Sequence, residues 1–226
     1  MKKLFLLLLI PFTLNAEPLT SKDMKTGVSV IRHQLEPVFK QFNIENKYLF
    51  KLLKQVEKLK INNLYPDAIT FGIMARCQQG LGACVATQIN LAKERGEWIV
   101  SVYSLLGLQA GFAEMLKIEL YLAVCYGTCI GENGSGLFMG IDGMAAVGVG
   151  GGFFFDVGVD LTDAWAGKYE GNNIKEILKT STVYSGWGLD IGQGVGTSIG
   201  LYYYKHNYTF RNLTTHDLYT MSFIQF

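Results

Sequence analysis

The sequence predicts a mainly β protein, an antiparallel β-barrel of about eight strands preceded by an α-helical N-terminal segment. Before residue 62 apolar residues recur every three or four positions, and from Asp67 onward they alternate with small or polar residues. Glycine-rich stretches interrupt the alternating region at intervals typical of turns between strands. The chain therefore divides into residues 1–16, a helical segment 17–62 and a barrel 63–226.

Residues 1–16 have the features of a secretory signal peptide. Lys2 and Lys3 precede an apolar run from Leu4 to Phe12, and Ala16 suits a cleavage site. The run is too short to span a bilayer as a helix. Removing the two lysines leaves 18 Lys and Arg against 19 Asp and Glu. We expect an exported protein without the positive field that nucleic-acid binding requires.

Two amphipathic helices are predicted between Ser21 and about Ile61, with Ser21 placed to cap the first. The second carries a basic stripe on its polar side, formed by Lys47, Lys51, Lys54 and Lys58. Such a stripe is a candidate for binding anionic lipid headgroups, although a solvated helix face has the same pattern.

The alternating region predicts strands near 67–77, 83–93, 98–108, 113–126, 137–149, 153–162, 183–203 and 217–226. Residues 163–181 are expected to form an inserted connection that carries Trp165, Tyr169 and about two turns of amphipathic helix. An insertion of this kind can cover a barrel mouth, so these two aromatic residues are candidates for ligand binding.

Nearly every predicted strand has one apolar face, and the other face is mostly small or polar. A soluble barrel would turn the apolar face inward, whereas an outer-membrane barrel would turn it toward lipid. The low charge, 17%, and the positive mean hydropathy favour the membrane arrangement. The bare face is clearest from Trp187 to Tyr203, where glycine occupies most even positions. A helix packed inside the barrel, a ligand cavity, or glycines that permit strand coiling would each explain it.

Four aspartates, Asp142, Asp156, Asp160 and Asp190, stand on these small-residue faces and are candidates for lining a lumen or its rim. Buried carboxylates require partners, and Lys117 is one candidate. A catalytic group formed by His216, Asp217 and Ser222 is conceivable, yet no nucleophile-elbow motif accompanies it.

The four cysteines form two pairs close in sequence, Cys77 with Cys84 and Cys125 with Cys129. Two disulfides at hairpin tips are the simplest prediction for an exported chain, and cross-pairing stays open. The spacings are not those of zinc sites, and the glycine runs match neither a phosphate-binding loop nor a dinucleotide fold, so we expect no metal or cofactor.

The last residues, LYTMSFIQF, end in Phe226 with Ile224 two positions earlier. This ending resembles the terminal strand of small Gram-negative outer-membrane β-barrel proteins, and the resemblance stays at the level of that class. It implies an outer-membrane location, with a soluble periplasmic or secreted lipid-binding barrel as the alternative. The expected role is structural or amphiphile-binding, with membrane lipid as the partner. A lipid-modifying enzyme is the second alternative.

Overall fold

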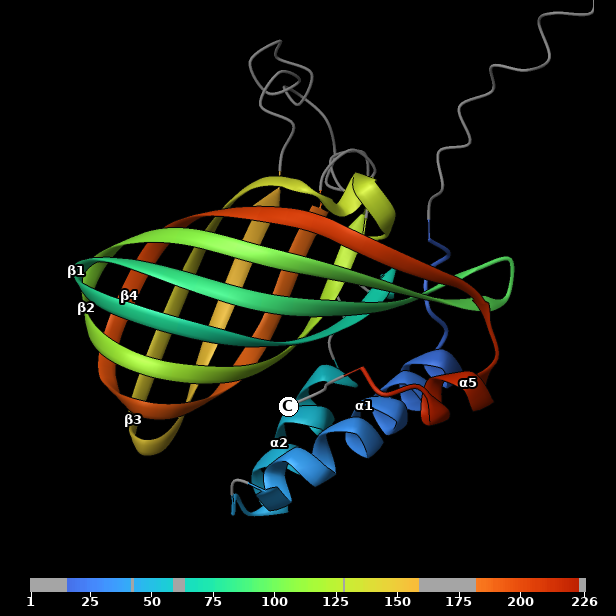
Figure 1. Cartoon of the computed structure of the whole chain (residues 1–226), viewed down its shortest axis with the longest axis horizontal. Coiled ribbons are helices and arrows are strands. Elements are labelled where there is room, and N and C mark those ends of the chain that lie inside the picture. The colour runs from blue at the N-terminus through green and yellow to red at the C-terminus, as the bar shows by residue number, and fades with distance from the viewer. Residues whose placement is uncertain (1–15, 42, 59–63, 128, 159–181, 224–226) are drawn as a thin grey trace, which may run out of the picture.

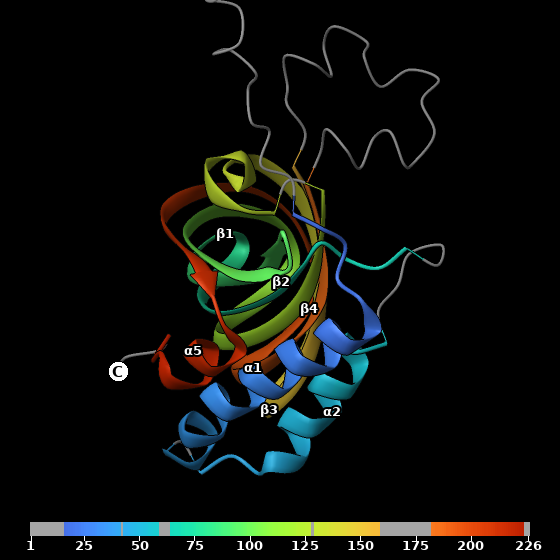
Figure 2. The same cartoon turned by 90° about the vertical axis from the view of Figure 1, so that its right-hand side faces the viewer.

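The computed structural model describes residues 16–41, 43–58, 64–127, 129–158 and 182–223. Its elements are α1 (Ser21–Gln41), α2 (Asn46–Val56), β1 (Ala68–Glu94), β2 (Glu97–Gly127), the 3-10 helix η1 (Gly131–Gly134), β3 (Gly136–Gly158), β4 (Thr182–Leu213) and α5 (Thr215–Thr220). The strands form one antiparallel sheet in the order β1-β2-β4-β3. The sheet closes in a ring of eight strand segments, seen end-on in Figure 2. The predicted fold class is confirmed.

Four long strands give eight segments because each strand bends and contributes two arms (Figure 1). In β1 the register against β2 shifts between Gln79 and Leu81, around Gly80, whose φ of 73° suits glycine. The two arms of β1 then meet, since the Thr70 hydroxyl donates a hydrogen bond of 2.9 Å to Asn90 Oδ1. The glycine stretches at 78–82, 109–111 and 150–152 therefore lie within continuous strands and are not turns between separate ones.

The predicted last strand, 217–226, is wrong, because Thr215–Thr220 form α5. Thr214 and Asp217 make a capping box in which each side chain accepts a hydrogen bond from the other residue's backbone N–H. The Gln34 side chain of α1 donates to the carbonyls of Leu218 and Met221 at 3.3 and 2.7 Å. The chain after β4 is thus fastened to α1, and residues 224–226 lie outside the described residues.

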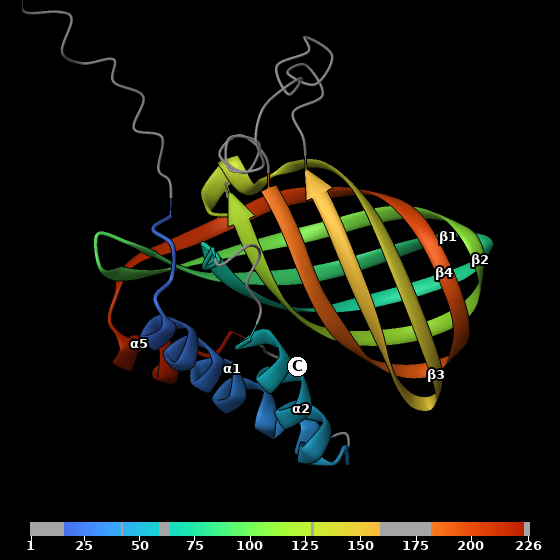
Figure 3. The same cartoon turned by 180° about the vertical axis from the view of Figure 1, so that it is seen from behind.

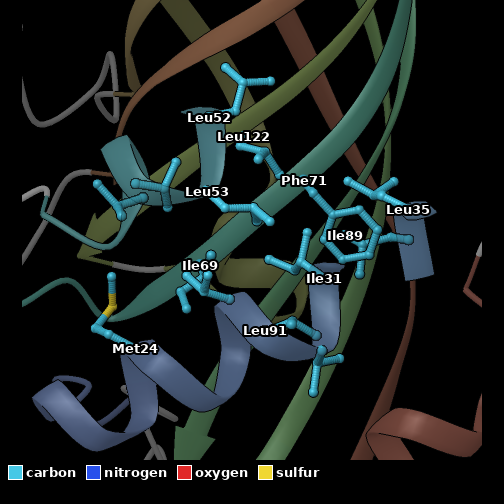
Figure 4. Packing of buried hydrophobic residues seen from close by; sticks show 14 of the residues in the cluster. Met24, Ile31, Leu35, Leu52, Leu53, Ile69, Phe71, Ile89, Leu91 and Leu122 are labelled. Atoms are coloured by element: carbon cyan, nitrogen blue, oxygen red, sulfur yellow. The ribbon is translucent and has the colours of Figure 1, made fainter. Parts of the chain in front are cut away.

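The helices α1 and α2 lie outside the barrel, against one side of its wall (Figures 1 and 3). Thr20, one residue before the predicted Ser21, caps α1 through its reciprocal hydrogen bonds with Asp23. An ion pair of 2.7 Å joins Asp23 to Lys93 of β1. Figure 4 shows apolar side chains of the two helices packed against apolar side chains of the barrel wall. The helix residues labelled there are Met24, Ile31, Leu35, Leu52 and Leu53, and the strand residues are Ile69, Phe71, Ile89, Leu91 and Leu122. The described helices therefore do not fill the barrel.

The wall not covered by the helices exposes apolar side chains. Phe112 is 96% exposed and Leu81 is 79% exposed, both near the bends of their strands. We call this surface the apolar band, and its members include Leu81, Val85, Leu106, Leu108, Phe112, Leu116, Ile118, Leu137, Met139, Ile141, Phe153, Phe155, Val195, Ile199, Leu201 and Tyr203. The apolar strand faces thus point outward.

Candidate functional site

The inward strand faces bring three of the four predicted aspartates into the barrel interior. Asp142 and Asp156 come from the two arms of β3 and Asp190 comes from β4, and all three are buried. They are neither exposed nor at a rim open to solvent. Asp160, with Trp165 and Tyr169, lies outside the described residues.

Asp142 is the most heavily hydrogen-bonded of these carboxylates. It forms an ion pair with the Arg76 guanidinium of β1. Its Oδ2 accepts hydrogen bonds from Gln109 Nε2 at 3.0 Å and from the Tyr202 hydroxyl at 2.8 Å. Its Oδ1 accepts a third from the Ser198 hydroxyl at 2.9 Å. Side chains from β1, β2 and β4 therefore meet at this one carboxylate of β3, which links the four strands across the barrel interior.

A second group of charges continues from Arg76. Glu119 Oε2 lies 3.7 Å from Arg76 Nη2 and 2.9 Å from Lys117 Nζ. Lys117 Nζ also lies 2.5 Å from Asp190 Oδ1, with both side chains buried. Lys117 was expected from the sequence as a partner, but Arg76 was missed. The signal was present, because Arg76 shares the inward parity of Thr70 and Gln78 on β1.

The end of the interior near η1 is closed by uncharged polar groups. Asn90 Nδ2 donates to the Cys129 carbonyl at 2.7 Å and to the Tyr184 hydroxyl at 2.9 Å. The Tyr103 hydroxyl donates to the carbonyls of Cys129 and Gly131 at 3.2 and 2.9 Å. The loop after β2 is thereby held over the barrel.

The bare glycine face has two explanations in the structure. The φ angles of Gly192, Gly194 and Gly196 are 143°, 152° and 149°, which favour glycine. Other glycines are required by side chains of neighbouring segments. A Cβ on Gly107 would lie 2.4 Å from the Tyr202 ring, and one on Gly72 would lie 2.5 Å from Tyr121. A Cβ on Gly188 would lie 2.0 Å from Glu119 Oε1. These glycines leave the space that the tyrosines and charged groups occupy. Neither the helices nor a ligand is needed to account for them.

The cysteine prediction is half correct. Cys125 and Cys129 form a disulfide, whereas Cys77 and Cys84 are free. Cys77 is exposed on the outer wall and Cys84 is buried beside Gly107 in the interior. Even positions of β1 face inward on both sides of Gly80, so Cys77 and Cys84 lie on opposite faces of the sheet and do not pair.

The described histidines form no catalytic group. His216 is exposed, and the Asp217 carboxylate, which would orient it, accepts the hydroxyl and backbone N–H of Thr214 at 2.6 and 2.7 Å. This cap holds the pKa of Asp217 below its usual value. His206 contacts Thr209 at 2.8 Å and the Tyr103 ring. Within the described residues, no three histidine, cysteine or acidic side chains are placed to hold a metal ion.

All four lysines of the basic stripe are exposed, but Lys58 lies in the turn after α2, which ends at Val56. Lys51 borders a groove. The groove lies between α2 and the outer faces of β3 and β4 and has a volume of about 660 Å³. Tyr48, Lys51 and Gln55 line it on the helix side, and Phe153 and Trp187 line it on the barrel side. Glycines 150–152, Gly188 and Gly196 form much of its floor. This groove was not predictable from the sequence, because it depends on where α2 packs against the barrel.

Comparison with known proteins leaves the geometry as the only guide to function. No protein-family model, no curated protein and no solved structure matches this chain. Among the described residues, the helices are too short or too polar to cross a membrane.

Proposed function

We propose that this protein is an exported, non-conducting outer-membrane β-barrel that binds lipid on its outer wall. The main support for the proposal is the distribution of polar and apolar side chains between the inside and the outside of the barrel. Charged and amide side chains are buried inside, and large apolar side chains are exposed outside. A barrel in water requires the opposite sorting, and a barrel in lipid requires this one.

The extent of the apolar band supports the same proposal. Soluble monomers rarely expose contiguous apolar patches larger than a few hundred Å². Here outward residues of all four strands contribute, with Leu108, Leu116, Val195 and Ile199 each at least 60% exposed. Burial of such side chains in hydrocarbon contributes about 25 cal/mol per Å² of apolar surface. Lipid is the environment that covers this band without a protein partner.

The interior argues for a role on the wall and against transport through the barrel. Ion pairs join Arg76, Lys117, Glu119, Asp142 and Asp190 in the interior, and Asp156 accepts a hydrogen bond of 3.0 Å from the Tyr204 hydroxyl. The interior tyrosines are almost completely buried, namely Tyr103, Tyr121, Tyr184, Tyr202 and Tyr204. A water-filled channel would leave such groups solvated. The exposed lysines of α2 then lie where an interface helix meets anionic headgroups.

Cell fractionation of the native protein tests the proposal. We expect recovery in outer membranes after detergent extraction, with a folded form whose gel mobility changes on boiling. Reconstitution into planar bilayers should produce no steady conductance. Recovery as a soluble periplasmic or secreted protein would refute the membrane location, and open channels would refute the occluded interior.

A further inference from the structure

The groove beside α2 differs from the rest of the apolar band in its shape and its charge. Its barrel wall is formed by Phe153, Trp187, Leu189 and Val195, and its opposite side by the α2 residues Lys51 and Leu52. Phe153 and Val195 are 50% and 69% exposed and belong to the band. The groove is therefore continuous with the surface that we propose faces lipid, and an acyl chain can enter it from the side.

Glycines make the groove deep enough to hold a chain. Gly151 is exposed on the floor, and a Cβ there would meet only the Gly188 carbonyl, at 3.6 Å. The space is thus open and not taken up by a neighbouring side chain. Its volume of about 660 Å³ lies within the usual range of small-molecule binding sites.

Lys51 determines the sign of the charge that the ligand should carry. It is the member of the basic stripe that lines the groove, and no acidic residue is among the described lining residues. Lys47 is paired with Glu45 at 2.7 Å, whereas Lys51 has no ion pair within the described part of the chain. A free ammonium at the mouth of an apolar groove attracts an anionic group attached to a hydrocarbon chain.

We infer that this groove binds one acyl chain of an anionic lipid, with the carboxylate or phosphate of the headgroup at Lys51. The inference rests on the proposed membrane location and adds a defined site and a charge preference. Fatty acids and anionic phospholipids share the required chemistry.

Quenching of tryptophan fluorescence by brominated chains tests the inference, because Trp187 lines the groove and Trp98 is buried under the helices. The full chain, folded in dodecylphosphocholine micelles, is titrated with dibromostearate, with dibrominated phosphatidylglycerol and with dibrominated phosphatidylcholine. We expect saturable quenching by at least one anionic probe, and loss of that quenching in Trp187→Phe. The stronger of the two anionic probes identifies the source of the ligand.

Matched variants separate the site from general surface charge. Lys51→Gln should weaken binding of the anionic probe about fivefold. Lys54→Gln, with the same charge change one turn away and outside the groove, should change it less than twofold. Gly151→Leu should abolish saturable quenching, and Ala110→Leu, which places the same leucine side chain on the outer wall elsewhere, should preserve it. Boiling-dependent gel mobility verifies that each variant is folded, and Lys51→Gln alters only an exposed side chain.

Three results would overturn the inference. These are equal losses for the two lysine variants, equal binding of phosphatidylcholine and the anionic probes, and saturable quenching that survives Gly151→Leu. If any of these occurs in protein recovered from outer membranes, the groove assignment fails and the proposed function stands. Recovery of the native protein in a soluble fraction would instead refute the proposed function itself.

Discussion

The pair formed by Arg76 and Asp142 is predicted to be a main determinant of stability inside the barrel. Both side chains are at most 5% exposed. Arg76→Met removes the cation and leaves a buried carboxylate that has only the uncharged donors Gln109, Ser198 and Tyr202. Loss of one partner of a buried ion pair lowers the free energy of unfolding by about 3–5 kcal/mol. We expect the lower end of that range, because the three donors remain.

A second substitution tests whether the uncompensated charge of Asp142 causes the loss of stability. Adding Asp142→Asn to Arg76→Met removes the uncompensated charge and keeps an oxygen that accepts hydrogen bonds. The double variant should therefore be more stable than Arg76→Met alone, by about 1–3 kcal/mol. Urea unfolding of the barrel in micelles, followed by tryptophan fluorescence, measures the free energy of unfolding. Gel mobility before and after boiling verifies the folded state of each sample.

The pair formed by Arg32 and Glu36 on α1 is the matched control. Its atoms lie 2.7 Å apart, but its side chains are 51% and 35% exposed. Arg32→Met should lower the free energy of unfolding by less than about 1 kcal/mol, because water solvates the remaining charge. Equal effects of Arg32→Met and Arg76→Met, or a further loss when Asp142→Asn is added, would refute the reasoning about the buried charge.

Three further predictions concern other parts of the barrel. Gly186→Ala should lower the free energy of unfolding by about 1–3 kcal/mol, because its Cβ would lie 2.2 Å from the Leu122 carbonyl, and Gly151→Ala should be nearly neutral. Burial raises the pKa of Asp67, just before β1, to about 6, so the folded protein binds this proton more tightly than the unfolded chain. Stability should fall by about 2 kcal/mol as pH rises from 4 to 7 in the wild type relative to Asp67→Asn, and an unchanged pH profile in the variant would contradict this. A maleimide reagent should label Cys77 but not Cys84 in the folded protein; absence of labelling until reduction would show that the two are joined.

Features that depend on the local periodicity of the sequence could be predicted from it. The helical and alternating periods predicted both helices and the strand region, and the parity of the strands placed Asp142, Asp156 and Asp190 on one side of the sheet. The four-residue spacing of Cys125 and Cys129 predicted their disulfide, which is confirmed. Each of these features depends on residues close together along the chain.

Features set by long-range contacts were not predictable in the same way. Glycine at 78–82 reads equally as a turn or as a bend, and only the pairing of β1 with β2 on both sides of it decides. The last strand was mispredicted because an apolar run outweighed the signal Thr214-x-x-Asp217, which is a helix start. The inward parity of Arg76 was readable, but its pairing with Asp142, 66 residues away, depends on how the barrel closes.

The filled interior and the outward apolar band restrict where a ligand can act. The interior polar groups link the strands to one another across the barrel. The outer wall is therefore the accessible surface. On that wall, α1 and α2 cover one side and the apolar band occupies much of the rest. At the boundary between them lies the groove that Lys51, Phe153 and Trp187 line. A lipid with an anionic headgroup is the kind of molecule that satisfies both a cation and an apolar wall at this boundary, so the docking of α2, and not the lumen, defines the site we propose.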